Sequence, residues 1–573
     1  MTIGNIYIIT AIAVTGGALF GFDIASLSAV LSTNQYKCYF NDGPDGPDLN
    51  GSKTCTGLTS LRQGGVTASM SAGSWLGSLI SGILTDKLGR KTSIMIGCVI
   101  WVIGCILTSA SQNVAMLIVG RIINGLAVGI ESSQVPVYVS ELSQPSLRGR
   151  VVAAQQWAIT WGILIMFYIS YGCSFIGGSP ETATNPAAFR VPWALQMIPA
   201  ICLFFGMMFL PESPRWLAKH DRWEECKEVL TLVHGKGDPN SVFARAELAD
   251  IREVVEFEAA NADATYWELF KPNMIHRTMV GLFTQIWSQL TGMNCMMYYI
   301  GYIFAMTGYS GNANLLASSI QYIINVLMTI PALLWIDRYG RRNAMLVGAF
   351  FMMIWMYANG AIMKSYGVVV PGGIQGVRAE SMLVTGPAGK ALIASTYLFV
   401  ASYAPTWGPA SWIYPPELFP LRLRGLGVSL ATSGNWAFNT ALGLFTPIAF
   451  QNIMWKTYIL FGVFCTSMFL HVFFLFPETA GKSLEETTYM FEDPNGFKYL
   501  GTPAWKTRVQ YSKAAEAERG NLDPEKLAAL NMEDKARAAG IDGPITGTAT
   551  HHSGEEVAPA TAAPVLSSPV QEA

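Results

Sequence analysis

The segment DKLGRK at residues 86–91 recurs later in the chain as DRYGRR at residues 337–342. Two further signatures repeat in the same order: a Glu-Leu pair followed by Arg-Gly at 141–149 and 417–425, and Pro-Glu-Ser/Thr at 211–213 and 477–479. One short match of this kind carries little weight. Three matches in one order indicate that the chain is built from two related halves with equivalent charged loops.

The sequence around these loops is strongly apolar. Of the 573 residues, 51% are hydrophobic and 13% are charged, whereas soluble domains carry roughly 25% charged residues. A membrane helix needs about 20 predominantly apolar residues, and twelve runs are of this kind, six in each half. They lie at about 6–32, 64–85, 93–111, 114–138, 151–175, 191–210, 279–305, 314–336, 344–364, 390–415, 425–449 and 456–476.

These runs predict an all-α polytopic membrane protein with twelve transmembrane helices in two six-helix pseudo-repeats. We expect an N-terminal bundle over 1–210, a cytoplasmic helical segment over 211–278, a C-terminal bundle over 279–476 and a cytoplasmic tail over 477–573. The tail is rich in Ala, Pro, Thr, Ser and Glu, which predicts disorder beyond about residue 495.

Composition also excludes several classes of function. The net charge is −2 and no basic patch dominates, which argues against a nucleic-acid partner. The sequence shows no nucleophile constellation, no metal-ligand cluster and no phosphate-binding loop. It therefore predicts neither an enzyme nor a metal or cofactor site, and the lipid bilayer is the partner that the composition implies.

Lysine and arginine are concentrated in the loops that follow even-numbered spans, which places those loops and both termini in the cytoplasm. The first loop would then face outward. Within it, Asn50-Gly51-Ser52 matches a glycosylation sequon, and Cys38 and Cys55 could pair in an oxidising compartment. The alternative is a chance tripeptide and two free thiols.

The repeated loops place matched acids beside their arginines. Carboxylates and guanidinium groups at helix ends form charge-assisted hydrogen bonds, so we expect a cytoplasmic gate network that locks one conformation and breaks in another. The alternative is that the arginines only set topology, but topology does not require the acids. The network comprises Asp86, Arg90, Glu141, Arg148, Asp337, Arg341, Glu417 and Arg424.

Four longer motifs carry a family resemblance: PESPRWL at 211–217, QLTGMN at 289–294, GPASW at 408–412 and PETAGKSLEE at 477–486. From about residue 5 to 490 the chain resembles the sugar porter family of the major facilitator superfamily (MFS), and within it the fungal high-affinity glucose transporters. The resemblance implies the MFS fold and a multi-pass plasma-membrane transporter. Such a protein carries a monosaccharide, with D-glucose the best guess, by alternating access and functions as a monomer.

The resemblance also implies a substrate site. A sugar offers hydroxyl groups and apolar C–H faces, which suit neutral amides and an aromatic ring. The alternative for any single amide is that it holds membrane helices together. The implied substrate-binding residues are Gln156, Gln285, Gln289, Asn294, Asn325, Trp412 and Asn439.

Two local features should shape this site. Gly292 could unwind span 7 between Gln289 and Asn294, and Gly408-Pro409 should break span 10. The resemblance makes Tyr298 and Tyr299, which follow in span 7, the outer gate.

Energy coupling is implied by Asp23 in span 1 and its family partner Arg121 in span 4. An acid that alternates between an arginine and a proton can make the proton the coupling ion; the alternative is a static ion pair. Glu131 is a further acid inside a span, and it could pair, stay protonated or face the cavity. A passive hexose facilitator and a glucose sensor with little flux are the alternative functions.

Overall fold

The computed structural model describes residues 3–31, 33–41, 57–144, 147–178, 184–259, 265–309, 311–374, 379–480, 482, 487 and 491. Contacts divide the chain into Met1–Asn521 and Leu522–Ala573, and the second unit lies outside the described residues. Asn50, Cys55 and the tail beyond about residue 495 lie outside them too, so the predictions made for them stay predictions.

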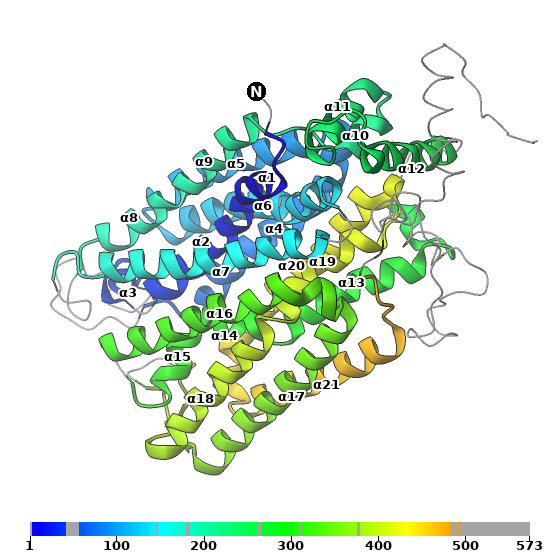
Figure 1. Ribbon diagram of the computed structural model, residues 1–573. Coiled ribbons are helices and arrows are strands. Elements are labelled where there is room, and N and C mark those ends of the chain that lie inside the picture. The colour runs from blue at the N-terminus through cyan, green and yellow to red at the C-terminus, as the bar shows by residue number, and fades with distance from the viewer. Residues whose placement is uncertain are drawn as a thin grey trace, which may run out of the picture. The chain divides into compact units, whose positions relative to one another are not determined.

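The first half consists of six successive helical spans (Figure 1). The first span is divided into two helices, and so is the sixth, because the helix is interrupted at Val14 and at Gln196. The helices are α1 (Ile6–Ala13), α2 (Thr15–Leu31), α4 (Ser60–Leu88), α5 (Arg90–Ser109), α6 (Val114–Leu142), α7 (Arg148–Cys173), α8 (Ala187–Leu195) and α9 (Met197–Met208), with the short α3 (Asn34–Tyr39) in the first loop.

The second half repeats this order with more interruptions. Its seventh span is divided into three helices and its tenth into two. The helices are α13 (Ile275–Leu290), α14 (Met293–Tyr298), α15 (Ile300–Ala305), α16 (Gly311–Tyr339), α17 (Arg341–Tyr366), α18 (Gly386–Tyr403), α19 (Trp407–Leu418), α20 (Arg424–Asn452) and α21 (Lys456–Leu475), with the 3-10 turn η2 (Leu421–Leu423) before α20.

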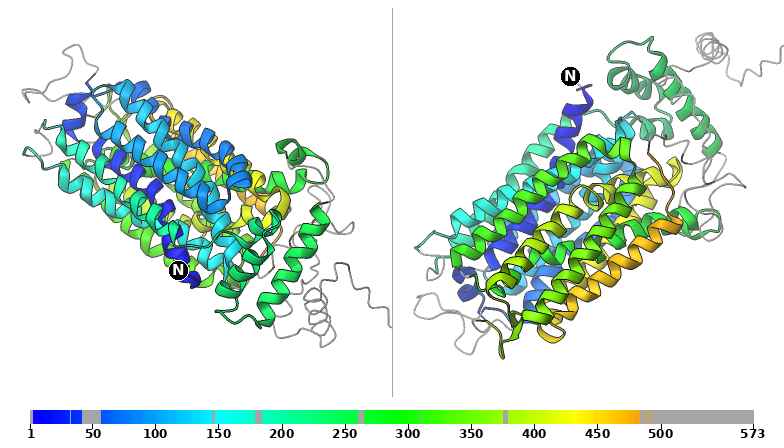
Figure 2. Two further views of the ribbon diagram at one scale, coloured as in Figure 1. Left: turned by 90° about the horizontal axis from the view of Figure 1, so that it is seen from above. Right: turned by 60° about the horizontal axis from the view of Figure 1, so that its bottom comes forward.

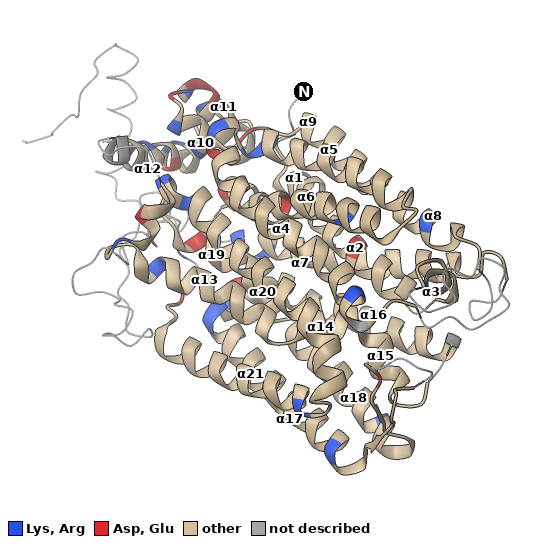
Figure 3. Cartoon of the chain, turned by 180° about the vertical axis from the view of Figure 1, so that it is seen from behind, with Lys and Arg blue, Asp and Glu red and all other residues tan. Residues whose placement is uncertain are grey.

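Three helices lie between the halves in sequence: α10 (Pro214–Lys219), α11 (Trp223–Val233) and α12 (Val242–Ala259), followed by the 3-10 turn η1 (Tyr266–Phe270). They gather at one end of the long helices (Figure 2), which we call the α10–α12 end. Charged residues concentrate at this end and are sparse along the middle of the bundle (Figure 3). Toward the opposite end lie α3 and a two-stranded antiparallel hairpin, β1 (Val368–Val369) with β2 (Met382–Leu383).

Among the described residues, eight helical segments are long and apolar enough to cross a membrane. The four other predicted spans are α4, α13–α15, α18–α19 and α20. α4 and α20 are rich in Gly, Ser and Thr, and the other two spans are broken, so none offers a long apolar window. Together they complete the twelve-helix MFS arrangement that the sequence predicts.

The most extensive packing between the halves is that of α4 on α20 and of α7 on α16. Within the first half, α4 also crosses α6 closely, because Gly73 and Gly125 face the backbone of the other helix. Small residues at such crossings are typical of membrane bundles. Large apolar side chains, for example Phe205 and Leu327, are exposed on the outer faces, where lipid would cover them.

Span 10 is broken just before Gly408-Pro409, as the sequence predicts. α18 ends at Tyr403 and α19 begins at Trp407. A proline disrupts the turn that precedes it, because its ring clashes with the carbonyl group four residues earlier and it has no N–H to bond that group. For Pro409 that residue is Pro405, which lies inside the break.

Candidate functional site

A narrow cavity lies between the two halves. Its volume is about 30 Å³, room for about two water molecules. The first half contributes α2 and α7 to its wall, and the second half contributes α13, α14, α16, α18, α19 and α20. The side chains with hydrogen-bonding atoms along this wall are Gln156, Ser288, Gln289, Asn294, Asn325, Tyr403, Trp412 and Asn435.

Gln289 is the centre of the amide cluster. Its Oε1 accepts hydrogen bonds from Asn294 Nδ2 at 2.8 Å and Asn439 Nδ2 at 3.1 Å, and its Nε2 donates to Asn435 Oδ1 at 2.7 Å. Asn294 would face away from Gln289 on a continuous helix. Gly292 has a φ of 86°, in the left-handed region. The helix is interrupted at this residue, and the interruption brings the side chains of Asn294 and Gln289 together.

The halves also meet across the cavity. Trp412 Nε1 on α19 donates to Gln156 Oε1 on α7 at 3.0 Å. Asn325 lies in the wall on α16, and its Oδ1 has no hydrogen-bond partner among the described residues. The polar groups therefore bond mainly to one another, and a sugar would replace those bonds with its hydroxyl groups.

Two predicted binding residues do not line the cavity. Gln285 Nε2 donates to the backbone oxygen of Ser411 at 2.8 Å. Asn439 lies behind Gln289, and its Oδ1 accepts a hydrogen bond from Ser71 Oγ of the first half at 2.6 Å. In this conformation both amides support the wall of the cavity.

The sequence prediction missed three polar residues of the wall. Ser288 and Tyr403 join their hydroxyl groups at 3.0 Å, and Asn435 bonds Gln289. Asn435 could have been found from its spacing, because it lies one helical turn before Asn439. Ser288 and Tyr403 carry no such signal, because hydroxyl residues are common in membrane helices.

Asp23 and Arg121 form a bidentate ion pair inside the first half. Arg121 Nη1 and Nη2 lie 3.1 Å and 3.0 Å from the two carboxylate oxygens of Asp23, and both residues are at most 2% exposed. Arg121 Nε also donates to the backbone oxygen of Val66 at 2.9 Å. On α2, Asp23 is flanked by Phe20 and Ile24, which line the cavity.

Toward the end opposite α10–α12, contacts close the space between the halves. Ser28 of α2 bonds the hydroxyl of Tyr322 at 3.0 Å and the backbone oxygen of Met297 at 3.2 Å. The predicted outer-gate residues lie in this region. Tyr299 donates to the backbone oxygen of Gly443 at 3.0 Å, and Tyr298 is buried.

At the α10–α12 end, each half holds the same buried ion pair. Arg90 bonds Glu141 through Nε and Nη2 at 3.0 Å and 3.2 Å. Arg341 bonds Glu417 through the same atoms at 3.2 Å and 2.8 Å. The sequence repeat therefore corresponds to a structural repeat of these contacts.

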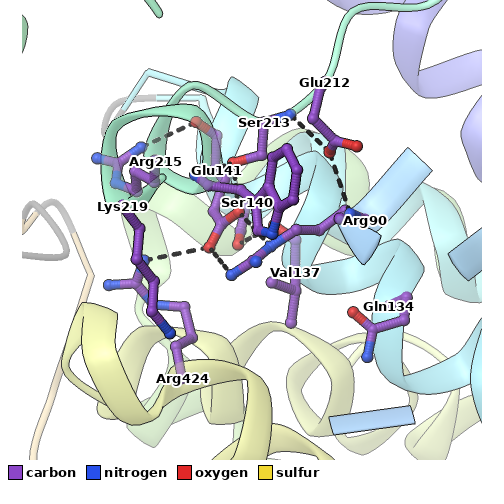
Figure 4. Close-up of polar contacts among 12 residues, drawn as sticks. Arg90, Gln134, Val137, Ser140, Glu141, Glu212, Ser213, Arg215, Lys219 and Arg424 are labelled. Atoms are coloured by element: carbon purple, nitrogen blue, oxygen red, sulfur yellow. Dashed lines mark hydrogen bonds and ion pairs between the residues drawn. The ribbon is translucent and has the colours of Figure 1, made fainter. Parts of the chain in front are cut away.

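The Pro-Glu-Ser/Thr signature adds further contacts to the ion pair of each half. Sequence reasoning missed this role. In the first half, Ser213 Oγ donates to Glu141 at 2.5 Å, and Glu212 accepts from the backbone N–H of Arg90 at 3.1 Å (Figure 4). In the second half, Thr479 Oγ1 donates to Glu417 at 2.6 Å, and Glu478 accepts from the backbone N–H of Arg341 at 2.9 Å. Each Pro-Glu-Ser/Thr segment thus caps a helix and binds the central acid.

Contacts at this end also cross between the halves. Arg424 Nη1 lies 3.5 Å from Glu141 Oε1, and the backbone N–H of Arg150 donates to Asp337 Oδ2 at 2.8 Å. Arg148 Nη1 of the first half donates to the backbone oxygen of Lys482, which follows the last helix of the second half, at 3.2 Å. The remaining predicted member, Asp86, lies 3.4 Å from Lys219 of α10. All eight predicted network residues therefore lie at the α10–α12 end.

The segment α10–α12 is attached to the first half by a buried cluster. Arg215 donates to the backbone oxygen of Glu141 at 2.8 Å and to Glu247 at 3.1 Å, and His234 Nδ1 lies 2.7 Å from Glu247. Burial alone would raise the pKa of Glu247, but His234 and Arg215 lower it to about 2. Burial lowers the pKa of His234, and Glu247 reverses that shift and raises it. The cluster therefore holds its charges while buried.

Cys38 in the first loop is disulfide-bonded, whereas the seven cysteines in the later parts of the described chain are free. Its predicted partner Cys55 and the predicted glycosylation site Asn50 lie outside the described residues. The described residues also contain no group of three His, Cys, Asp or Glu side chains that could hold a metal ion.

A family model for sugar (and other) transporters matches residues 9–491. The chain is 47% identical over 541 residues to the high-affinity glucose transporter of Kluyveromyces lactis, with 93% of each chain covered. It is 43% identical over 525 residues to the MFS glucose transporter mfs1 of Aspergillus flavus, covering 90% of this chain and 95% of the relative.

Among solved structures, the proton:xylose symporter XylE of E. coli, bound to 6-bromo-6-deoxy-D-glucose, matches with a TM-score of 0.70 at 25% identity. The match covers 85% of this chain and 99% of XylE. The chain therefore belongs to the sugar transporter family of the major facilitator superfamily, whose members are membrane transporters and not enzymes.

Proposed function

We propose that the protein is a plasma-membrane monosaccharide transporter that carries D-glucose by alternating access in symport with protons. The observation that carries this proposal is the amide-lined cavity between two halves that contact each other at both ends. The fungal relatives are glucose transporters, which supports glucose as the sugar, and XylE is a proton:xylose symporter, which supports the proton as the coupling ion.

The cavity suits a neutral polyhydroxylated ligand. Amide side chains both donate and accept hydrogen bonds, and the indole of Trp412 offers an apolar face to a sugar ring. Because the cavity is narrow, the sugar must separate Gln289 from its amide neighbours and widen the space between the halves. Each bond that the cluster gives up is replaced by a bond to a sugar hydroxyl, so binding and widening occur together.

Alternating access requires each end to open in turn. Opening the α10–α12 end separates Arg424 from Glu141 and Asp337 from the backbone of Arg150, whereas opening the other end separates Ser28 from Tyr322. Both sets of contacts cross between the halves. Rocking of one half against the other can therefore exchange one set for the other around the central cavity.

Proton coupling would act through Asp23. Protonation neutralises its carboxylate and leaves Arg121 buried without its counter-ion, which is costly. The protonation state of Asp23 therefore biases the packing of α2 against α6. Since Phe20 and Ile24 of α2 line the cavity, this packing is linked to the sugar site.

We further propose that the α10–α12 end and both termini face the cytoplasm, because the arginine-rich loops lie at that end. One chain should be the functional unit, since all the cavity residues come from a single chain. Besides the neutral sugar, the mechanism needs one ion, the proton.

The test is uptake of labelled D-glucose by purified protein in liposomes, with and without an inward proton gradient. Accumulation above the external concentration only with the gradient is the expected result. Equilibration with or without the gradient would instead identify a passive facilitator. Saturable glucose binding without flux would favour a sensor, and absence of binding would contradict the sugar site itself.

A further inference from the structure

Glu131 occupies a niche built for a carboxyl group inside the first half. It lies on α6, is 1% exposed and faces α2 and α5. A Cβ atom on Gly16 of α2 would lie 2.7 Å from Glu131 Oε2, and one on Gly97 of α5 would lie 2.5 Å from Oε1. Glycine on two neighbouring helices thus leaves the space that the carboxyl group fills.

Among the described residues, no cationic side chain pairs with the Glu131 carboxyl group. Oε1 accepts one hydrogen bond, from Cys98 Sγ at 3.6 Å, and Oε2 has no hydrogen-bond partner within the same part of the chain. From α9 the nearby side chain is apolar Leu203. An isolated buried carboxylate is very costly, and such a group is tolerated in its neutral form.

Glu131 and the Asp23–Arg121 pair share one helix interface. Gly16 and Asp23 are seven residues apart on α2, which is about two turns, so they lie on the same face about 10 Å apart. On α6, Arg121 contacts Asp23, and Glu131 lies further toward the α10–α12 end. The titratable groups that α5 adds along this interface are Cys98 and Cys105.

We propose that Glu131 is a second proton-binding site of the transporter, on the α10–α12 side of Asp23. In the conformation described here, Asp23 pairs with Arg121 and Glu131 holds a proton. When the α10–α12 end opens and water reaches the niche, the Glu131 carboxyl group releases this proton to water, because the carboxylate is then solvated. It takes up a proton from water again before the niche closes, so the carboxyl group is ionised only while it is hydrated.

This inference rests on the proposed proton symport, and a permanent structural role is its competitor. A neutral acid that only fills the niche can be replaced by glutamine, which has the same shape and cannot release a proton. The two roles therefore differ in Glu131→Gln. Glu131→Asp keeps a carboxyl group in the niche and should retain coupling.

The experiment compares wild type, Glu131→Gln, Glu131→Asp and Cys98→Ala in liposomes. Two transport modes are measured: glucose accumulation driven by a proton gradient, and glucose exchange without a gradient. We expect Glu131→Gln to lose accumulation and keep exchange, whereas Glu131→Asp and Cys98→Ala keep both. Retained exchange shows that the glutamine variant is folded. If the glutamine variant accumulates glucose as wild type does, the proposal is overturned.

Infrared spectroscopy of the purified proteins at neutral pH provides a readout that needs no transport. The C=O stretching band of protonated carboxyl groups should be weaker in Glu131→Gln than in wild type by the contribution of one group. A spectrum that the substitution leaves unchanged would overturn the proposal even if transport changed. If wild-type protein itself fails to accumulate glucose, symport is wrong and the second proton site falls with it. If only the second proton site is wrong, wild-type protein still accumulates glucose, so the two failures can be told apart.

Discussion

The two halves share a fold but differ in what they place in the middle of the membrane. The first half holds Asp23, Arg121 and Glu131 far from its helix ends. In the described spans of the second half, charged residues lie close to the helix ends. The polar side chains of the cavity wall come mainly from the second half. The first half contributes Gln156, and the second half contributes the others.

Under the proposed function, this difference places proton chemistry in one half and most of sugar recognition in the other. In the second half, the breaks at Gly292 and at Ala404–Thr406 lie beside the cavity, and the first of them brings Asn294 to Gln289. The charged residues of the first half lie within the unbroken helices α2 and α6. Coupling then depends on the places where the halves touch, which makes the division of roles testable by substitution.

The largest expected effect is that of Asp23→Asn. Asparagine keeps the shape and can still bond Arg121, but it cannot bind or release a proton. Proton-driven glucose accumulation should be abolished while glucose exchange continues. Accumulation is measured in liposomes with an inward proton gradient, and the exchange assay is the control for folding. Undiminished accumulation would remove Asp23 from coupling and reduce the ion pair to a structural role.

The second prediction compares the repeated ion pairs at the α10–α12 end. Arg341→Ala leaves Glu417 without its bidentate partner and should cost about 3–5 kcal/mol of stability. Arg341 Nη2 also lies 3.1 Å from Asp337 Oδ1, and Asp337 holds the backbone N–H of Arg150 in the other half. Because the substitution removes this support from Asp337, access from the α10–α12 end should increase. Arg90→Ala should have the smaller effect, because Glu141 keeps its contact with Arg424.

Thermal unfolding measures the stability of both variants, and labelling of cysteines introduced along the cavity measures access. Equal destabilisation by the two substitutions would show that the contact between Arg424 and Glu141 does not distinguish the halves. Unaltered labelling of Arg341→Ala would leave this arginine with a topological role only.

The repeated network was the part of the site most open to prediction from sequence. The repeated arginines and acids leave few possible pairings, because a buried arginine must form an ion pair with a carboxylate. The function of Glu212 and Glu478 was not evident, because each binds backbone N–H groups of a helix more than a hundred residues away. Such a contact depends on the tertiary fold, which brings distant segments of the chain together, and the local spacing of residues does not encode it.

The sugar site was less predictable in detail. The family resemblance selects the right helices, but the direction of each amide depends on tertiary contacts. Gln285 and Gln289 share a helical face by spacing, yet Gln285 bonds the backbone of α19 while Gln289 lines the cavity. A small difference in position on one face decides between the two environments.

That difference gives the third prediction. Gln289→Ala removes the centre of the amide cluster and should weaken glucose binding by about 1–3 kcal/mol. Gln285→Ala is the matched control from the same helix face and should weaken binding less, because its amide contacts the backbone of Ser411. Binding to purified protein is measured by calorimetry. Equal losses would mean that Gln285 turns toward the sugar when it binds, and no loss at Gln289 would exclude it from the site.

The smallest expected effect concerns the bond that joins the two halves across the cavity. Trp412→Phe keeps an aromatic ring but removes the indole N–H that bonds Gln156, so glucose should bind about two- to tenfold more weakly, for a loss of about 0.5–1.5 kcal/mol. Trp436→Phe is the matched control, since Trp436 Nε1 also bonds across the halves, to Ser132 Oγ at 3.0 Å, but does not line the cavity. If both variants lose the same glucose affinity, the Trp412 bond acts through the packing of the halves. A loss confined to Trp412→Phe would instead place the first half's contribution to sugar recognition at Gln156.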